Sequence, residues 1–158
     1  VTAWIAVTDA NEKNGCMRMW AGSHKKDLIH HEQKFDENNL LTRGQTIKNV
    51  PLEETDPVVL EEGQMSLHHP TVVHGSGLNK SNDRRIGFVV QSYIGSNVDQ
   101  VLGKIYVQKA RGEDTHKFHQ YSNIPQKLMA KEDILSWNTA KDELSKIFYN
   151  GAIKKGKY

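Results

Sequence analysis

The first part of the chain alternates short apolar runs with polar turns. Residues 2–8 (TAWIAVT) are rich in β-branched and aromatic side chains, and residues 16–22 (CMRMWAG) alternate apolar and polar positions. Both patterns are typical of β-strands. The polar segment between them contains Asn14-Gly15, a sequence that favours a tight turn. The pattern therefore predicts two strands joined by a turn.

A long polar segment follows before the strand pattern returns. Residues 25–50 show no strand periodicity, which predicts a surface excursion of the kind that can act as a lid. The later strand candidates are residues 57–70 (two strands around Glu62-Gly63), 71–77, 84–95 and 104–110. The segment 84–95 is the longest of these candidates.

The pattern changes near Pro125. Apolar residues then recur at steps of three and four or their sums, which indicates an amphipathic helix, at Leu128, Trp137, Leu144, Ile147 and Phe148. Asn150-Gly151 is a suitable helix end. We therefore expect a mostly β protein with α decoration, in which residues 1–110 form the β domain and residues 111–158 form a helical extension packed on it.

Composition narrows the range of partners. The 158 residues suit one domain, and the net charge of +2 arises from 21 basic and 19 acidic residues. This near balance gives no support for a nucleic-acid or membrane-surface partner. The single cysteine, Cys16, cannot form an intramolecular disulfide and fits a reducing compartment, so we expect a cytoplasmic protein.

Residues 68–85 (HHPTVVHGSGLNKSNDRR) concentrate polar chemistry in a hairpin-sized segment. If residues 71–77 form a strand, His74 and Ser76 point to the same face. The imidazole nitrogen is a common ligand of iron, zinc and copper. A histidine at a strand end that bonds a neighbour is the alternative interpretation, and it applies to most isolated histidines.

Arg85 favours a functional interpretation of His74. It lies eleven residues later, after a polar loop and at the start of the next strand candidate. If the two strands pair, His74 and Arg85 face one cavity, where the guanidinium offers a forked, permanently charged donor to a carboxylate. We expect the neighbouring Arg84 to be solvated instead.

Two segments resemble the phytanoyl-CoA dioxygenase family of iron(II)/2-oxoglutarate-dependent oxygenases. The segment HHPTVVHGSGLNKSNDRR resembles that family's H-P-x-x-x-H-G-S-G-x-N-x-S…R signature, and WIAVTDANEKNGCMRMWAGSHK resembles its W-x-A, N-G-C and G-[ST]-H-K signature. The tail ARGEDTHKF…IFYNGA is similar to a C-terminal helical extension of bacterial relatives. The resemblance implies a double-stranded β-helix, a jelly-roll fold that is also called cupin-like.

The resemblance also implies roles for individual residues. His74 would be the distal histidine ligand of iron(II), and Arg85 would pair with the far carboxylate of 2-oxoglutarate. Ser76 would hydrogen-bond the same carboxylate, and Trp4 would line the cosubstrate pocket. The implied activity is a hydroxylase, or dioxygenase, that uses molecular oxygen to oxidise a small organic substrate while 2-oxoglutarate is decarboxylated to succinate.

The other signature residues are expected to have structural roles. For Gly15, Gly22, Ser23 and His24 we expect mostly turn geometry. Cys16 is expected to be a small buried residue and not a nucleophile.

The family's iron site needs two histidines and one carboxylate, and its H-x-D motif precedes the W-x-A strand. The only H-x-acid sequence here, His30-His31-Glu32, follows that strand and lies in the excursion. We therefore interpret the chain as the C-terminal portion of a double-stranded β-helix that is incomplete at its N-terminus and inactive when isolated. Such a piece would leave a strand edge open, and we expect it to form a homodimer through that edge.

Three alternatives stay open. Halogenases of the superfamily replace the carboxylate ligand at the position that precedes Val1, so the chain does not separate halogenase from hydroxylase; we favour the commoner hydroxylase. A cupin-like protein that binds a small molecule without redox chemistry is the second alternative. His116 and His119 could share a helix face and bind zinc, but no further ligand completes that site, which favours surface histidines.

His68 and His69 would face opposite ways in a strand, and one of them can enter the cavity.

Overall fold

The computed structural model describes the whole chain except residues 36, 38–40 and 154–158. The chain forms two compact units. The first, here called the sheet unit, contains residues 1–32 and 46–94, and the second, the helix unit, contains residues 33–45 and 95–158. The predicted division at residue 110 stays a prediction.

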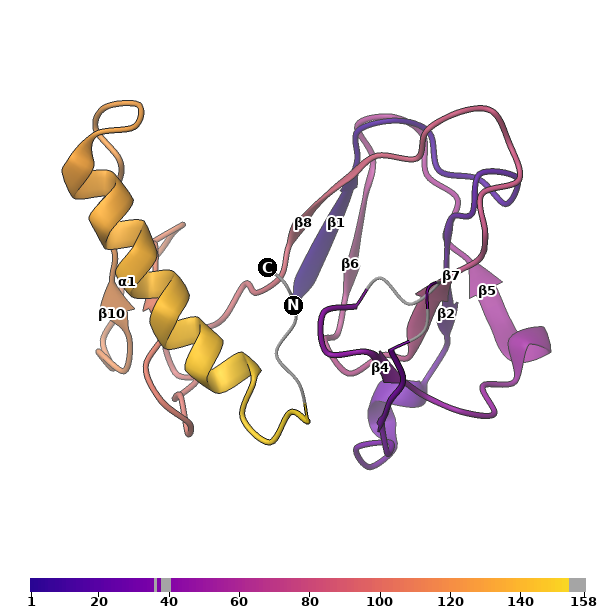
Figure 1. Ribbon diagram of the computed structural model, residues 1–158, viewed down its shortest axis with the longest axis horizontal. Helices are drawn as coiled ribbons and strands as arrows, with labels where there is room; N and C mark the ends of the chain where they lie inside the picture. Colours follow the sequence, from indigo (N-terminus) through magenta and orange to yellow (C-terminus); the bar gives the residue numbers. More distant parts are fainter. Residues whose placement is uncertain (36, 38–40, 154–158) are drawn as a thin grey trace. The chain divides into compact units, whose positions relative to one another are not determined.

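The first sheet of the sheet unit is built around β1 (Thr2–Ala6). β1 pairs antiparallel with β6 (Met65–His68) on one side and with β8 (Gly87–Val90) on the other, as Figure 1 shows. Trp4 stands opposite Ser66 on one neighbour and Val89 on the other. Because side chains alternate along a strand, Trp4, Ser66 and Val89 point to the same face.

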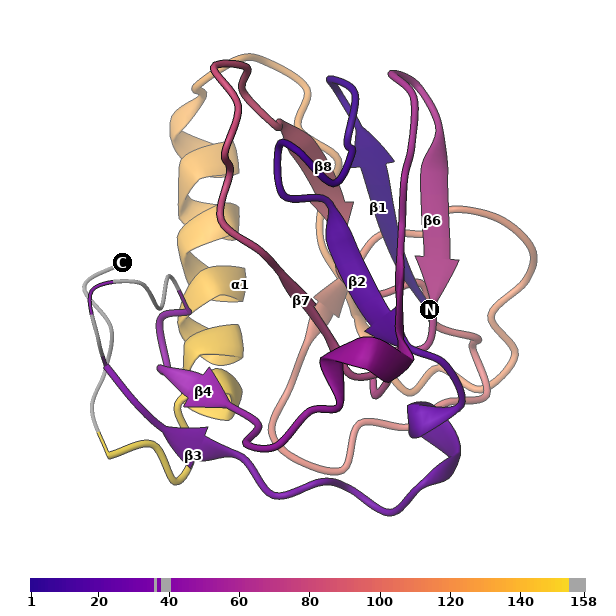
Figure 2. The ribbon, with the colours of Figure 1, turned by 90° about the vertical axis from the view of Figure 1, so that its right-hand side faces the viewer.

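The second sheet is built around β2 (Met17–Trp20). Its antiparallel neighbours are β5 (Thr55–Pro57) and β7 (His74–Ser76). Figure 1 shows them on the two sides of β2, and Figure 2 shows β7 beside β2. The register places Met19 opposite His74. The chain therefore crosses repeatedly between the two sheets, since β1, β6 and β8 belong to one and β2, β5 and β7 to the other.

The buried core of the sheet unit lies between these sheets. Trp4 and Ala6 from β1 pack in one cluster with Met17 from β2, and with Ala10 and Cys16 from the connection between the two strands. Burying such apolar surface is the main favourable term in folding. The core therefore holds the inner face of β1, and with it Trp4, in a fixed place.

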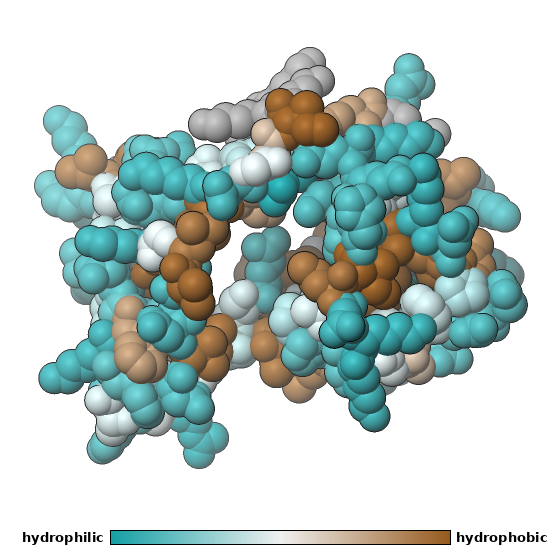
Figure 3. All heavy atoms as spheres, turned by 90° about the horizontal axis from the view of Figure 1, so that it is seen from below, coloured by the Kyte–Doolittle hydropathy of each residue, from teal (hydrophilic) through white to brown (hydrophobic). Residues whose placement is uncertain are grey.

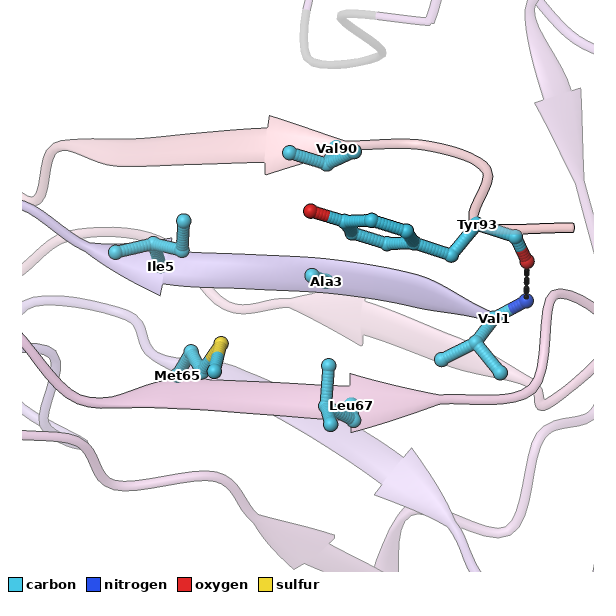
Figure 4. Close-up of a pocket in the computed structure, with 7 residues that line it drawn as sticks. All are labelled: Val1, Ala3, Ile5, Met65, Leu67, Val90 and Tyr93. Atoms are coloured by element: carbon cyan, nitrogen blue, oxygen red, sulfur yellow. Dashed lines mark hydrogen bonds between the residues drawn. The ribbon is translucent and has the colours of Figure 1, made fainter. Parts of the chain in front are cut away.

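The opposite face of the β1 sheet is also apolar but open. Figure 4 shows the side chains that line a shallow depression of about 320 Å³ there: Val1, Ala3, Ile5, Met65, Leu67, Val90 and Tyr93. The backbone nitrogen of Val1 donates a hydrogen bond of 2.8 Å to the carbonyl oxygen of Tyr93 beside it. Met65 and Leu67 are 56% and 62% exposed, so β6 has apolar side chains on its outer face while Ser66 and His68 face inward.

Two short 3₁₀ helices flank the predicted excursion, and a small ladder lies within it. The 3₁₀ helices are η1 (Ser23–Lys25) and η2 (Leu52–Glu54). The ladder pairs β3 (Glu32–Gln33) with β4 (Gln45–Thr46). The described residues of the excursion are therefore mostly irregular, as expected from its lack of periodicity.

The helix unit contains one long helix and one short parallel ladder among its described residues. The ladder pairs β9 (Tyr106–Val107) with β10 (Gln120–Tyr121). The helix α1 (Lys131–Phe148) covers most of the predicted helical segment, and Gly151 with a φ of 68° lies just beyond its end. None of the residues of α1 is buried, and Figure 3 shows apolar side chains on the surface of both units.

The predicted fold class is confirmed at the level of strands and helix: the protein is mostly β with one C-terminal helix in the part that the structure describes. The predicted strand at 84–95 is shorter than expected, since β8 has four residues. In the segment 57–62, which is described throughout, the only strand pairing beyond Pro57 is the bridge from Leu60 to Ala10. Among the residues with a described position, no helix has the length and apolar character needed to span a bilayer.

Candidate functional site

Trp4, Ser76 and Arg85 meet in the sheet unit although they come from three different strands or their ends. Arg85 lies just before β8, and its Nη2 donates a hydrogen bond of 3.3 Å to Oγ of Ser76 on β7. The guanidinium carbon of Arg85 lies 5.5 Å from the centre of the Trp4 ring. Trp4 is buried and Arg85 half-buried, so an aromatic wall supports one side of the cation.

Gly87 makes room for the Trp4 ring. It stands opposite Ala6 on β1, two residues after Arg85. A Cβ atom at this position would overlap the indole atoms of Trp4. Gly87 is not among the glycines with a positive φ, so its backbone conformation does not require a glycine. The packing of the Trp4 ring against it does.

The hydrogen bonding of His74 leaves one ring nitrogen available. Its Nδ1 lies 2.9 Å from the carbonyl oxygen of Val72. Because a carbonyl oxygen only accepts, Nδ1 must carry a hydrogen, and in the neutral ring Nε2 then has a lone pair for a metal ion. A backbone carbonyl on the other nitrogen is a usual way of orienting a histidine that ligates a metal. His74 is exposed on β7, on the same face as Ser76.

The expected pairing of the two strands that carry His74 and Arg85 is wrong. β7 pairs with β2, and β8 pairs with β1 in the other sheet. The connection between them therefore crosses from one sheet to the other, and Asn79 shapes it by accepting hydrogen bonds from the backbone N–H and hydroxyl of Ser81. Arg85 reaches the face of β7 through its side chain, at Ser76, and not through a strand ladder.

The G-S-H-K segment fixes the strand that carries His74. Oγ of Ser23 accepts a hydrogen bond of 2.8 Å from the backbone N–H of Val73, and Ser23 is only 2% exposed. The carbonyl oxygen of Val73 accepts a second bond, from the backbone N–H of Trp20. The residue before His74 is thus held on both of its backbone groups, and Gly22 with a φ of 78° supplies the turn that places Ser23.

The N-G-C segment packs directly on the H-G-S-G segment. Gly15 has a φ of 76°, and a Cβ atom there would lie 2.5 Å from the carbonyl oxygen of Gly77. The backbone N–H of Lys80 also donates to the carbonyl oxygen of Lys13. The turn geometry expected for Gly15 and Gly22 is confirmed, and the contact explains why the two signatures occur together in one fold.

Cys16 is a buried free thiol. Burial, followed by the negative charge of Glu12, raises the pKa of the Cys16 thiol above its usual value. The thiol therefore stays protonated at neutral pH, and since the thiolate is the nucleophile, Cys16 is a packing residue, as expected.

His68 enters the site and His69 does not. The ring of His68 lies 5.4 Å from the ring of His74, and its Nδ1 is 3.3 Å from Oγ of Ser66. Burial, followed by the neighbouring His74, lowers the pKa of His68, which favours a neutral ring. His69 instead bonds the Thr71 hydroxyl on the other face of the strand. Sequence analysis predicted that the two rings diverge but did not identify which one reaches His74.

The remaining histidines form no comparable cluster among the described residues. The carboxylate of Glu32, in the His30-His31-Glu32 segment, forms an ion pair of 2.7 Å with Lys48. His116 and His119 lie outside any helix, and Nε2 of His119 donates to the carbonyl oxygen of Val98. Within the described ranges, no group of three or more His, Cys, Asp or Glu side chains is arranged to hold a metal ion.

The sequence matches the profile of the phytanoyl-CoA dioxygenase family over residues 1–87, more than half of its 158 residues. The chain therefore belongs to the phytanoyl-CoA dioxygenase family. The matched range contains Trp4, both signature segments, His74, Ser76 and Arg85.

Two relatives show how wide this family is. The chain is 31% identical over 100 residues to peroxisomal phytanoyl-CoA dioxygenase of Bos taurus, covering 54% of this chain and 26% of the bovine protein. It is 29% identical over 105 residues to a probable α-ketoglutarate-dependent hypophosphite dioxygenase of Stutzerimonas stutzeri, covering 65% of this chain and 36% of that protein. The chain therefore spans about a quarter to a third of these relatives.

Two solved structures have the same fold. The non-heme monooxygenase ThoJ in its apo form superposes with a TM-score of 0.79 at 25% identity, over 94% of this chain and 53% of that chain. A ThoJ–Ni complex superposes with a TM-score of 0.71 at 24% identity, over 96% of this chain and 52% of that chain. The chain covers about half of the ThoJ chain.

Proposed function

We propose that the chain is the C-terminal part of an iron(II)/2-oxoglutarate-dependent dioxygenase that hydroxylates a small organic substrate. The observation that carries the proposal is the contact of Arg85 with both Ser76 and Trp4, on the strand face that also presents His74. A fixed guanidinium beside a hydroxyl and an aromatic wall suits a carboxylate. A histidine with a free Nε2 on the same strand suits a metal ion.

In this proposal each residue has a separate task. His74 supplies one nitrogen ligand to iron(II), with its ring oriented by the bond to Val72. Arg85 and Ser76 hold the far carboxylate of 2-oxoglutarate, and Trp4 closes one side of its pocket. When bound, the iron supplies the activation of oxygen that protein side chains lack.

The other two protein ligands would come from a part of the protein that precedes Val1. A 2-His-1-carboxylate site needs them, and the described residues provide no third ligand near His74. The coverage of about half of the ThoJ chain supports a larger protein. So does the fold, because the six strands that the described residues share between the two sheets of the sheet unit are two fewer than a double-stranded β-helix contains.

The substrate class is left broad because the relatives are named after a fatty acyl-CoA and an inorganic phosphorus acid. Hydroxylase chemistry is preferred to halogenation because it is the commoner reaction. The distinction lies in the H-x-D motif: a carboxylate there completes a hydroxylase site, and a small residue in its place leaves room for chloride.

Oxygen consumption by the full-length protein tests the proposal. We expect uptake that requires both iron(II) and 2-oxoglutarate and that releases succinate, and we expect His74→Ala to abolish it. His116→Ala, which changes a histidine of the helix unit, is the matched control and should retain full uptake. Uptake that does not depend on 2-oxoglutarate, or binding of a small molecule without any uptake, would favour a cupin-like binding protein instead.

A further inference from the structure

His68 lies beside His74, but the proposed function assigns it no part in binding iron or 2-oxoglutarate. It is the last residue of β6, paired with Thr2 at the start of β1. Its neighbours on the strand, Leu67 and Met65, face the open apolar side of the β1 sheet. The alternation of the strand therefore directs His68 to the inner face, where Trp4 also lies.

The contact between the two histidines joins the two sheets. His68 belongs to β6 in the β1 sheet, and His74 belongs to β7 in the β2 sheet. Their ring centres are 5.4 Å apart and their planes are inclined by 55°. A metal–imidazole bond is only about 2 Å long, so a metal bound to Nε2 of His74 on the side of His68 would bring its other ligands within reach of the His68 ring.

The hydrogen bonds of His68 leave it a free polar atom. Its Nδ1 pairs with the hydroxyl of Ser66, two residues earlier on the same strand face. Among the described residues, none hydrogen-bonds Nε2 of His68. When the Ser66 hydroxyl donates to Nδ1, the neutral ring carries its hydrogen on Nε2, so this atom becomes a donor for an oxygen ligand.

We propose that His68 is a binding residue of the cosubstrate site, where its Nε2–H donates to a carboxylate oxygen at the metal-binding end of 2-oxoglutarate. The proposal rests on the proposed function. It divides the cosubstrate between two polar positions: Arg85 and Ser76 hold the far carboxylate, and His68 holds the near carboxylate beside His74. His68 binds the cosubstrate directly in this scheme and is not a metal ligand.

Two probes separate the two ends of the cosubstrate in the full-length protein loaded with Ni²⁺. The first is 2-oxoglutarate, and the second is pentanoate, which keeps one carboxylate on a five-carbon chain but lacks both the near carboxylate and the keto group that chelates metal. We expect His68→Phe, which keeps a ring of similar size but removes both nitrogens, to weaken 2-oxoglutarate binding about tenfold, or about 1.4 kcal/mol. Pentanoate binding and Ni²⁺ affinity should change by less than about twofold, because pentanoate has only the carboxylate that Arg85 and Ser76 would hold.

Two further variants control for folding and for position. His68→Gln keeps an N–H donor and should recover at least part of the affinity for 2-oxoglutarate. His69→Phe makes the same change on the other face of the strand, where the ring contacts His24 and Thr71, and should leave all three affinities unchanged. Calorimetry measures each affinity directly, without turnover.

The outcomes distinguish this inference from the proposed function. Unchanged 2-oxoglutarate affinity in His68→Phe, with normal binding by the unmodified protein, would overturn the role of His68 alone. A loss of Ni²⁺ affinity in His68→Phe would also overturn it, because His68 would then be a metal ligand. An unmodified protein that binds no 2-oxoglutarate in the presence of Ni²⁺ would contradict the proposed function itself.

Discussion

The sheet unit and the helix unit use similar residues in different ways. In the sheet unit, glycines and small polar residues stand where backbone segments approach closely, as Gly15 does against Gly77 and Ser23 against Val73. In the helix unit, α1 has an amphipathic sequence, yet apolar residues such as Trp137 and Leu144 are 63% and 50% exposed. Hydrophobic periodicity predicted α1 but does not identify close contacts between backbone segments. In the sheet unit, residues of the family signature, such as Gly15 and Ser23, stand at those contacts.

Two glycines, one in each unit, have the same backbone φ but differ in whether another backbone segment lies close to them. Gly15 and Gly112 both have a φ of 76°. A Cβ on Gly15 would meet the backbone of the 77–79 segment, whereas a Cβ on Gly112 would meet no atom within 4 Å. We expect Gly112→Ala to cost about 1 kcal/mol for the left-handed conformation alone. Gly15→Ala should cost about 3 kcal/mol or more, since backbone must also move.

Urea denaturation of the full-length protein measures both free energies of unfolding. Gly22→Ala is a second control within the sheet unit, because its φ is 78° and an added Cβ would have no atom within 4 Å. Equal losses of stability for Gly15→Ala and Gly22→Ala would show that the contact with Gly77 has no energetic weight.

Two hydroxyl groups extend the comparison to hydrogen bonds. Ser23 is buried, and its Oγ accepts from the backbone N–H of Val73, whereas the exposed Thr139 donates to the carbonyl oxygen of Leu135 within α1. Ser23→Ala leaves a buried donor without a partner, which costs about 1–3 kcal/mol. Thr139→Ala should change stability by less than about 0.5 kcal/mol, since surface helix substitutions are nearly neutral.

Amide hydrogen exchange measures the loss of the hydrogen bond from Val73 to Ser23 directly, at the Val73 amide. The Val73 amide should exchange at least about fivefold faster in Ser23→Ala, since a loss of about 1 kcal/mol is roughly a factor of five. The amides of α1 should keep their rates in Thr139→Ala. Unchanged protection of Val73 would mean that another group or water replaces the serine hydroxyl.

Sequence analysis named residues that the structure brings together, Arg85 with Ser76 and Trp4, but it did not predict their route through the fold. The spacing of His74 and Ser76 is enough to place both on one face of a strand, and β7 has that geometry. The position of Arg85 was reached through an incorrect assumption, that consecutive strands pair. Most consecutive strands are neighbours, but β7 and β8 belong to different sheets, and nothing in the polar loop between them indicates the crossing.

Other features needed the tertiary structure. Gly87 has an ordinary backbone conformation, so only the position of the Trp4 ring explains it. The alternation along β6 predicts that one of His68 and His69 faces inward, but the choice depends on the register between β6 and β1. Ser23 acts on Val73, which is 50 residues away in sequence, and its hydroxyl carries no local signal of that partner.

The affinity of the full-length protein for 2-oxoglutarate, measured with Ni²⁺ bound, tests the central claim most directly. Arg85→Ala should weaken it at least about tenfold, or about 1.4 kcal/mol, because the carboxylate loses its charged partner. Arg84→Ala removes the adjacent, exposed guanidinium and should leave the affinity unchanged. Equal affinities for Arg85→Ala and the unmodified protein would show that the Arg85, Ser76 and Trp4 cluster does not bind the cosubstrate.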